Sequence, residues 1–322
     1  LLSTSIVFFM LAIMATWLLA GTLDFTPGGI FDHQVATSTS AILLIFFIFG
    51  IGKAAIVPFH RWLPAAMVAP TPVSALLHAV AVVKGGVFTI LKICSYIFGL
   101  DLMAELASTQ ALLYLAGVSV FLASLVAMRQ DNLKKRLAYS TVSQLGYVTI
   151  AALLANHAGL IAGSMHMVIH AFAKITLFFC AGAILVRTEI KHISQMAGLG
   201  HQMPFTMAAF FIASLSIIGL PPTAGLWSKW FLFQGALQAE QWLLLLTLCL
   251  SSLMSIYYLL AIPIRAFFPG EDASPLRPVR QEAPLPILVA IAVSVSVCVL
   301  LFFFPDALFN LAAAAITTGE AG

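Results

Sequence analysis

The stretch from Pro204 to Ala236 reads PFTMAAFFIASLSIIGLPPTAGLWSKWFLFQGA, and its pattern decides the class of fold. A transmembrane helix needs about 20 predominantly apolar residues, and this stretch is long and apolar enough to supply one. Its centre, Gly219 to Gly225, holds two glycines and two prolines, which a regular helix cannot accommodate. Irregular backbone at membrane depth is tolerated only inside protein or along a watery cavity. The sequence therefore predicts a broken membrane helix, with Lys229 about one turn beyond the break.

Three further lysines, Lys53, Lys84 and Lys174, lie inside apolar stretches, and no Asp or Glu shares the stretches that carry these membrane lysines. A cation at the bilayer centre costs roughly 2.5 to 3.5 kcal/mol on insertion scales, so four unpaired cations cost on the order of 10 kcal/mol. Ionisable groups inside a membrane therefore indicate a path for ions or protons. Lys53 also lies beside breaking residues, because Gly52 and Pro58 flank it. A kink that serves packing alone is the alternative.

The composition indicates a polytopic membrane protein. Of 322 residues, 61% are hydrophobic and only 8% are charged, against roughly 25% charged in soluble domains. The net charge of +3 arises from loop cations, so no nucleic-acid partner is expected. Four cysteines lie in apolar segments without metal-ligand spacing, so we expect buried free thiols and neither a metal nor a cofactor. They are Cys94, Cys180, Cys249 and Cys298.

Apolar runs and their breakers predict an all-α protein with about nine membrane helices in a single transmembrane domain, residues 1–322. The predicted helices are Leu2–Gly21, Ser38–Phe59, Pro70–Phe98, Gln110–Met128, Leu137–Ala155, Gly159–Val186, Pro204–Ala236, Gln241–Phe267 and Pro284–Phe304. The chain begins in an apolar run without a basic leader, so we expect it to start within a longer protein.

The basic residues fall in alternate loops between the predicted helices, and the intervening loops contain no Lys or Arg. By the positive-inside rule this pattern predicts a cytoplasmic Leu1 end and an outer C-terminus. Such an arrangement requires an odd number of helices, which agrees with nine. The cations are Arg61, then Arg129, Lys134, Lys135 and Arg136, then Arg187 and Lys191, and finally Arg277 and Arg280.

The stretch His166 to Lys174, HMVIHAFAK, places His166, His170 and Lys174 at i, i+4 and i+8, so all three lie on one stripe of a helix. Neighbouring side chains on such a stripe stand about 6 Å apart, a distance that a proton crosses through one or two waters. Histidine suits this task because its ordinary pKa is near 6.5. A row of polar groups that only joins neighbouring helices is the structural alternative.

The third predicted helix carries His78 and Lys84. Six residues correspond to about 240° of rotation in a regular helix, which predicts different faces and different neighbours for the two side chains. Gly85 and Gly86 beside Lys84 allow another element to approach closely. Further along, LAYSTVSQLGY at 137–147 concentrates hydroxyl and amide groups, which suit either a water-accessible entrance or bonds between helices.

Four motifs together resemble the antiporter-like membrane subunits of respiratory complex I, of membrane-bound hydrogenases and of Mrp-type monovalent cation/proton antiporters. They are GKAAIVPFHRWLPAAMVAPTPVSALLHAVAVVKGG from Gly52, NLKKRLAYSTVSQLGY from Asn132, HMVIHAFAKITLFFCAGAI from His166 and GLPPTAGLWSKW from Gly219. The resemblance implies about fourteen helices in two inverted repeats, each with a discontinuous helix. The nine helices then correspond to the sixth to fourteenth, with 1–155 forming most of the first repeat and 156–322 most of the second.

The resemblance also implies roles for individual residues. Lys53 and Lys229 match the lysines of the two broken helices, and Lys174 matches the lysine that connects the half-channels. The histidines His78, His166 and His170 fall on polar-axis positions, and Lys84 corresponds to a lysine of the Mrp-like subunits. The family's glutamate partner of Lys53 is expected upstream of Leu1.

We therefore expect a proton-translocating subunit of a multisubunit Na⁺/proton antiporter, most similar to the Mrp D or A component, in a prokaryotic inner membrane. Its partners are other membrane subunits, the lipid bilayer, protons and, as a candidate cargo, Na⁺. The first alternative is a pump subunit of complex I or a hydrogenase; in either case the chain transports rather than catalyses. A di-haem cytochrome using His78, His166 or His170 and a scaffold without transport are further alternatives.

Overall fold

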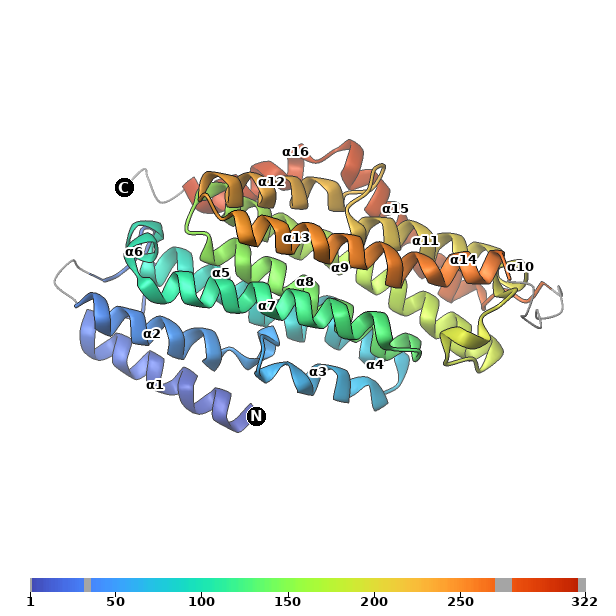
Figure 1. Ribbon diagram of the computed structural model, residues 1–322, viewed down its shortest axis with the longest axis horizontal. Helices are drawn as coiled ribbons and strands as arrows, with labels where there is room; N and C mark the ends of the chain where they lie inside the picture. The colour runs from blue at the N-terminus through green and yellow to red at the C-terminus, as the bar shows by residue number, and fades with distance from the viewer. Residues whose placement is uncertain (1, 32–35, 270–279, 318–322) are drawn as a thin grey trace.

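The computed structural model describes residues 2–31, 36–269 and 280–317. Within these ranges every regular element is a helix, apart from an isolated bridge between Asn132 and His192. The long helices lie roughly along the longest axis of the molecule, and α9 extends through the middle of the bundle (Figure 1). The predicted all-helical membrane fold is confirmed.

The helices of the first half are α1 (Leu2–Ala20), α2 (Thr37–Gly50), α3 (Trp62–Ala65), α4 (Thr71–Ala75), α5 (Val82–Ile93), α6 (Leu100–Glu105), α7 (Ala107–Arg129) and α8 (Leu133–Leu153). A π-helical turn, Leu76–Val80, joins α4 to α5, and another, Cys94–Phe98, extends α5. The run Thr71–Phe98 is thus one continuous span of 28 residues.

The helices of the second half are α9 (His157–Thr188), α10 (Leu199–Gln202), α11 (Pro204–Ile218), α12 (Gly225–Gln238), α13 (Trp242–Ser255), α14 (Ala261–Phe267), α15 (Leu285–Phe303) and α16 (Asp306–Thr317). The π-helical turn Ile256–Leu260 joins α13 to α14. Each of the nine predicted segments corresponds to one helix or to two consecutive helices in the described part of the chain.

Both predicted helix breaks are present. α11 ends at Ile218, Gly219 adopts a left-handed conformation with φ of 92°, and α12 begins at Gly225. α2 ends at Gly50, and Lys53 follows on the short 3₁₀ turn Gly52–Ala54. This second segment does not end at Phe59 as predicted, because short helical turns continue to Val68.

Four short helices, α3, α6, α10 and α16, were not predicted. With 4, 6, 4 and 12 residues, all are shorter than the length that a membrane crossing requires. A search for long apolar runs therefore passes over them. Of the loop cations that predicted the orientation, Arg277 lies outside the described residues.

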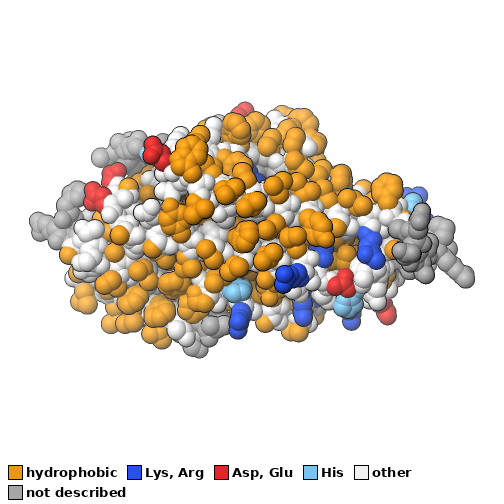
Figure 2. Space-filling model, viewed as in Figure 1, with side chains coloured by type: hydrophobic (Ala, Val, Ile, Leu, Met, Phe, Trp, Pro, Cys, Tyr) orange, Lys and Arg blue, Asp and Glu red, His pale blue; other side chains and the backbone are white. Residues whose placement is uncertain are grey.

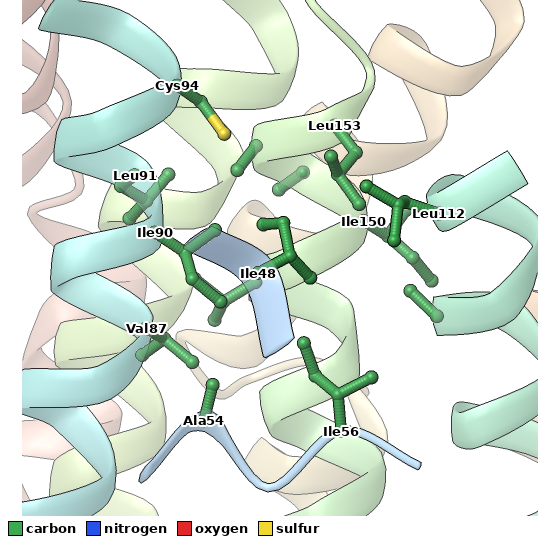
Figure 3. Packing of buried hydrophobic residues seen from close by; sticks show 14 of the residues in the cluster. Ile48, Ala54, Ile56, Val87, Ile90, Leu91, Cys94, Leu112, Ile150 and Leu153 are labelled. Atoms are coloured by element: carbon green, nitrogen blue, oxygen red, sulfur yellow. The ribbon is translucent and has the colours of Figure 1, made fainter. Parts of the chain in front are cut away.

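A hydrophobic core fixes the first broken segment against its neighbours. Figure 3 shows Ile48 of α2 and Ala54 and Ile56 of the broken stretch beside Val87 and Ile90 of α5. The backbone can approach this closely because residue 86 is glycine: a Cβ there would lie 2.5 Å from the Ala54 nitrogen. The core thus holds the Lys53 turn against the helix that carries Lys84.

The two ends of the bundle differ in charge. α7 ends at Arg129, α8 begins next to Lys134 and Lys135, and α9 ends next to Arg187. Figure 2 shows most Lys and Arg side chains of the visible face on the half toward these helix ends. We call this end of the bundle the basic end.

Candidate functional site

Six of the seven predicted site residues are buried, although all seven carry ionisable side chains. Lysines are almost never fully buried in proteins without a partner, so their contacts are informative. Lys53 is the exception, because its side chain is exposed. The buried residues and their exposed fractions are His78 0%, Lys84 7%, His166 4%, His170 1%, Lys174 0% and Lys229 4%.

The stripe on α9 has the predicted geometry. The rings of His166 and His170 stack with their centroids 5.8 Å apart and their planes 23° apart. One turn further on, Lys174 Nζ donates a hydrogen bond of 3.1 Å to the Leu137 carbonyl of α8. Three ionisable groups thus follow one face of a single helix through the interior.

Lys84 of α5 joins this stripe from the side. Its Nζ lies 2.5 Å from Nδ1 of His170. When Lys84 is protonated its ammonium only donates, so His170 Nδ1 then accepts and a neutral His170 ring carries its proton on Nε2. The contact connects α5 and α9 through two residues that are 86 positions apart in the sequence.

Lys229 lies at the second helix break, and the break supplies its partner. Its Nζ donates to the carbonyl of Ile218, the last residue of α11, at 2.8 Å, and to Ser252 Oγ at 3.0 Å. The last carbonyls of a helix have no intrahelical partner and carry partial negative charge. Ending α11 in the interior thus creates an acceptor for an ammonium at a place where none of the described residues offers a carboxylate.

Tyr147 of α8 lies between His166 of the α9 stripe and Lys229 at the second helix break. The centroids of the Tyr147 and His166 rings lie 5.7 Å apart in a stacked arrangement. Lys229 Nζ lies over the Tyr147 ring, 4.9 Å from its centroid, in a cation–π contact. Its hydroxyl donates to the Leu248 carbonyl at 3.0 Å and lies 3.2 Å from Ser252 Oγ. Tyr147 therefore bridges the α9 stripe and the broken helix.

Ser228 of α12 makes a second contact between the broken helix and the α9 stripe, because its Oγ lies 2.9 Å from His166 Nδ1. We refer to Lys84, His170, His166, Tyr147, Ser228 and Lys229 together as the buried array. Sequence reasoning missed the roles of Tyr147 and Ser228 in it, and the contact that Ser252 makes with Lys229. Two features of the sequence could have indicated these roles. Ser228 directly precedes Lys229, and Tyr147 lies in the polar run of α8.

A row of hydroxyl groups continues from the array toward the basic end. Ser252, which contacts Lys229, follows Ser251 on α13, and Ser251 Oγ lies 2.8 Å from Ser124 Oγ. Next along the row, Ser255 and Ser140 contact the hydroxyl of Tyr258, at 3.0 and 3.2 Å. The Tyr258 carbonyl accepts from Arg136, and the row includes Ser143 as well.

His78 lies outside the array. Its Nδ1 is 2.9 Å from the Ser74 carbonyl, its Nε2 is 3.1 Å from the Leu63 carbonyl, and its ring lies 5.4 Å from that of Phe178 on α9. The prediction that His78 and Lys84 face different elements is wrong, since both face α9. The π-helical turn Leu76–Val80 and the bend that follows it change the rotation that a regular helix would give.

Lys53 approaches the array through its turn, which packs against Gly86 of α5. A Cβ at Gly86, two residues beyond Lys84, would lie 2.6 Å from the Lys53 carbonyl carbon. The Lys53 side chain itself is exposed, on a face of the chain that the described residues leave uncovered.

The described residues contain no group of three His, Cys, Asp or Glu side chains placed to hold a metal ion. All four cysteines are free, and three of them are buried as predicted. Cys249 is exposed, which corrects that expectation. An apolar sequence does not distinguish the core side of a membrane helix from the side that faces lipid.

The comparisons with known proteins identify the family and the fold. The family model described as "NADH:quinone oxidoreductase/Mrp antiporter, TM" matches residues 1–255. NADH-quinone oxidoreductase subunit N of Desulforudis audaxviator is 33% identical over 283 residues, which are 87% of this chain and 55% of that protein. Subunit L of Rickettsia bellii is 36% identical over 241 residues, 75% of this chain and 36% of that protein. The chain thus spans about half or less of the length of these relatives.

Solved structures show the same fold. The Mrp complex from Dietzia sp. DQ12-45-1b matches with a TM-score of 0.86 at 21% identity, covering 99% of this chain and 66% of that one. Respiratory complex I from Thermus thermophilus matches with a TM-score of 0.75 at 24% identity, covering 96% and 66%. At these identities the match concerns the fold.

Proposed function

This chain belongs to the family of transmembrane subunits shared by NADH:quinone oxidoreductases and Mrp antiporters, and from that premise we propose that it moves protons within a multisubunit Na⁺/proton antiporter. The observation that carries the proposal is the buried array, in which ionisable side chains from α5, α9 and α12 contact one another directly or through Tyr147 and Ser228. Groups that bind and release protons, spaced for transfer through the interior, form a proton relay.

The described residues around the buried lysines offer them only carbonyl, hydroxyl and imidazole acceptors for hydrogen bonds. An opposite charge near a lysine favours its protonated form, and departure of that charge favours release. A carboxylate supplied from outside the described residues would thus control the protonation of the first lysine, Lys53. The exposed side chain of Lys53 is accessible to such a carboxylate. Lys84, His170, His166 and Lys174 then relay the proton, His78 contributes beside them, and Lys229 controls exit.

The hydroxyl row from Ser252 to Tyr258 supports an exit or entry route between Lys229 and the basic end. The positive-inside rule supports a cytoplasmic location for that end, in a prokaryotic inner membrane with the C-terminus outside. Residues 1–155 and 156–322 would belong to two repeats, each containing one broken helix and its lysine.

A pump subunit of complex I or of a membrane-bound hydrogenase is the second candidate. It is favoured by the curated relatives, which are subunits N and L of NADH-quinone oxidoreductase. The same array would serve either complex, because the driving chemistry would lie on other subunits. Co-purification with peripheral iron–sulfur subunits would favour this candidate over the antiporter.

The test is proton and sodium flux by the complete complex in proteoliposomes, comparing wild type with Lys53→Ala, Lys174→Ala and Lys229→Ala. Arg129→Ala, at an exposed position outside the array, is the matched control. We expect each lysine variant to lose proton flux while the control retains it. Normal transport in all three lysine variants would contradict the relay, and proton flux without sodium flux would favour the pump.

A further inference from the structure

A large cavity opens at the basic end, away from the buried array. Its volume is about 1070 Å³, and it lies between the second half of the first broken segment, the end of α7, the start of α8 and the end of α9. Five cationic or imidazole side chains line it, and its described lining includes no Asp or Glu. They are His60, Arg61, Lys134, Lys135 and Lys191.

The cations of this cavity lack a neutralising carboxylate among the described residues that line it. Asp131 lies next to this loop, but it binds Ser194 through two hydrogen bonds and His192 at 3.3 Å. Lys134 Nζ donates to the Ala69 carbonyl at 2.7 Å, an uncharged partner that leaves the charge of the lysine unneutralised. The cavity is thus a site of concentrated positive charge.

Much of the remaining wall of the cavity is apolar, although four polar side chains also line it, Thr71, Gln130, Asn132 and Tyr139. Met67, Val126, Leu133 and Leu185 line it together with Val68, whose side chain is 95% exposed. An acidic protein segment would find partners for its charges but would leave these apolar groups unmatched. A molecule with an anionic head and hydrocarbon chains matches both parts of the lining.

We infer that this cavity binds an anionic phospholipid, with its phosphate among Lys134, Lys135 and Lys191 and its acyl chains along Val68 and the neighbouring apolar wall. Basic pockets between membrane helices attract lipid phosphates, and the anionic leaflet supplies them at this depth. The bound lipid would contact the broken segment, α8 and α9 at the same time, so it would join the Lys53 segment to the helices of the array.

The test uses the complete membrane complex in phosphatidylcholine nanodiscs that contain phosphatidylglycerol carrying a photo-reactive group on its acyl chain. Cross-linked peptides are quantified by mass spectrometry. We expect labelling of the segment around Met67 and Val68. Replacing one cation, Lys134→Gln or Lys191→Gln, should reduce labelling roughly fivefold, the effect of one lysine near an anionic surface.

Arg187→Gln is the matched control, because it removes the same charge at the same end from an exposed residue that does not line the cavity. It should leave the labelling unchanged. Val68→Asp provides a second variant that does not depend on the lysines. Its exposed position tolerates the carboxylate in the fold. The new negative charge should repel the anionic lipid and so reduce the labelling.

Three results would overturn the inference. Equal loss of labelling in Arg187→Gln and Lys134→Gln would show general attraction to the basic end. Complete competition by inorganic phosphate would show a site for phosphate without the lipid. Competition by polyglutamate at concentrations where excess unlabelled phosphatidylglycerol has no effect would show a docking site for an acidic protein segment.

Discussion

Lys84 makes the contact that connects two helices of the array, so its removal has the sharpest expected effect at the residue scale. Lys84→Met preserves the aliphatic stem and deletes the nitrogen that lies 2.5 Å from His170 Nδ1. A positioned proton-transfer group contributes roughly a hundredfold or more to the rate it serves. We expect proton flux in proteoliposomes to fall by about that factor.

Lys92→Met is the control for this prediction, since Lys92 lies on the same helix but contacts the rings of Phe25 and Tyr96 instead of the array. It should leave proton flux within about twofold of wild type, because such exposed cation–π contacts are worth only ~0.5–1 kcal/mol. Equal losses in the two variants would mean that the charge of α5, and not the His170 contact, matters.

Tyr147 tests whether the bridge between the histidines and Lys229 depends on its hydroxyl. Tyr147→Phe keeps the stacking on His166 and deletes the hydrogen bonds to Leu248 and Ser252. One buried hydrogen bond contributes about 1 kcal/mol, so we expect about a fivefold lower proton flux with an assembled complex. Tyr114→Phe, on the exposed side of α7, should have no effect. Unchanged flux in Tyr147→Phe would remove the hydroxyl from the relay.

At the scale of elements, the fit between the first broken segment and α5 depends on one glycine. A Cβ at Gly86 would lie 2.5 Å from the Ala54 nitrogen and 2.6 Å from the Lys53 carbonyl carbon, and backbone atoms cannot easily move away. Overpacking of this kind costs about 1 to 3 kcal/mol. Gly86→Ala should therefore lower the thermal unfolding temperature of the complex and displace the Lys53 turn.

The neighbouring glycine is the matched control. A Cβ at Gly85 would meet nothing within 4 Å, and alanine is favoured over glycine inside a helix by about 1 kcal/mol. Gly85→Ala should leave the unfolding temperature unchanged or raise it. If both variants unfold at the same temperature as wild type, the close approach of the two elements does not limit stability.

The connection between α7 and α8 is held to the loop before α10 by Asp131. Partial burial raises the pKa of this carboxyl, but hydrogen bonds from Ser194 and the charges of His192 and Arg136 outweigh that effect and lower the pKa. A carboxyl with a lowered pKa stabilises the folded contact above its unfolded pKa, about 3.9, and loses that contribution as pH falls through the folded value.

Hydrogen exchange at the Ser194 amide measures this contact, because that N–H donates to Asp131 at 2.9 Å. Protection should be constant from neutral pH down to about pH 4 and fall below it. Asp131→Asn should show the lower protection at every pH. A pH dependence that persists in Asp131→Asn would assign the transition to another group.

The sequence predicted some elements of the site better than others, for physical reasons. A stripe at i and i+4 depends only on helix geometry, so His166 and His170 are neighbours as expected. The breaks were visible because Gly219 and Pro221 act locally. The contact between Lys84 and His170 depends on the rotation of α5, which a π-helical turn altered. No local pattern reveals such a turn, nor the exposure of Lys53, which depends on what else packs there.

At the scale of the whole molecule, the separation of charge between the two ends predicts the orientation in the membrane. Gln195 is exposed near the cations of the basic end, and Asp101 is exposed in α6 at the other end. In a variant with the exposed Cys249 replaced by serine, Gln195→Cys should react with a membrane-impermeant maleimide only in inside-out vesicles, and Asp101→Cys only in right-side-out vesicles. Loops rich in Lys and Arg are retained in the cytoplasm, which is the physical reason for this expectation. The reverse labelling would place the basic cavity in the outer leaflet, and labelling of both cysteines from one side would contradict the odd number of crossings.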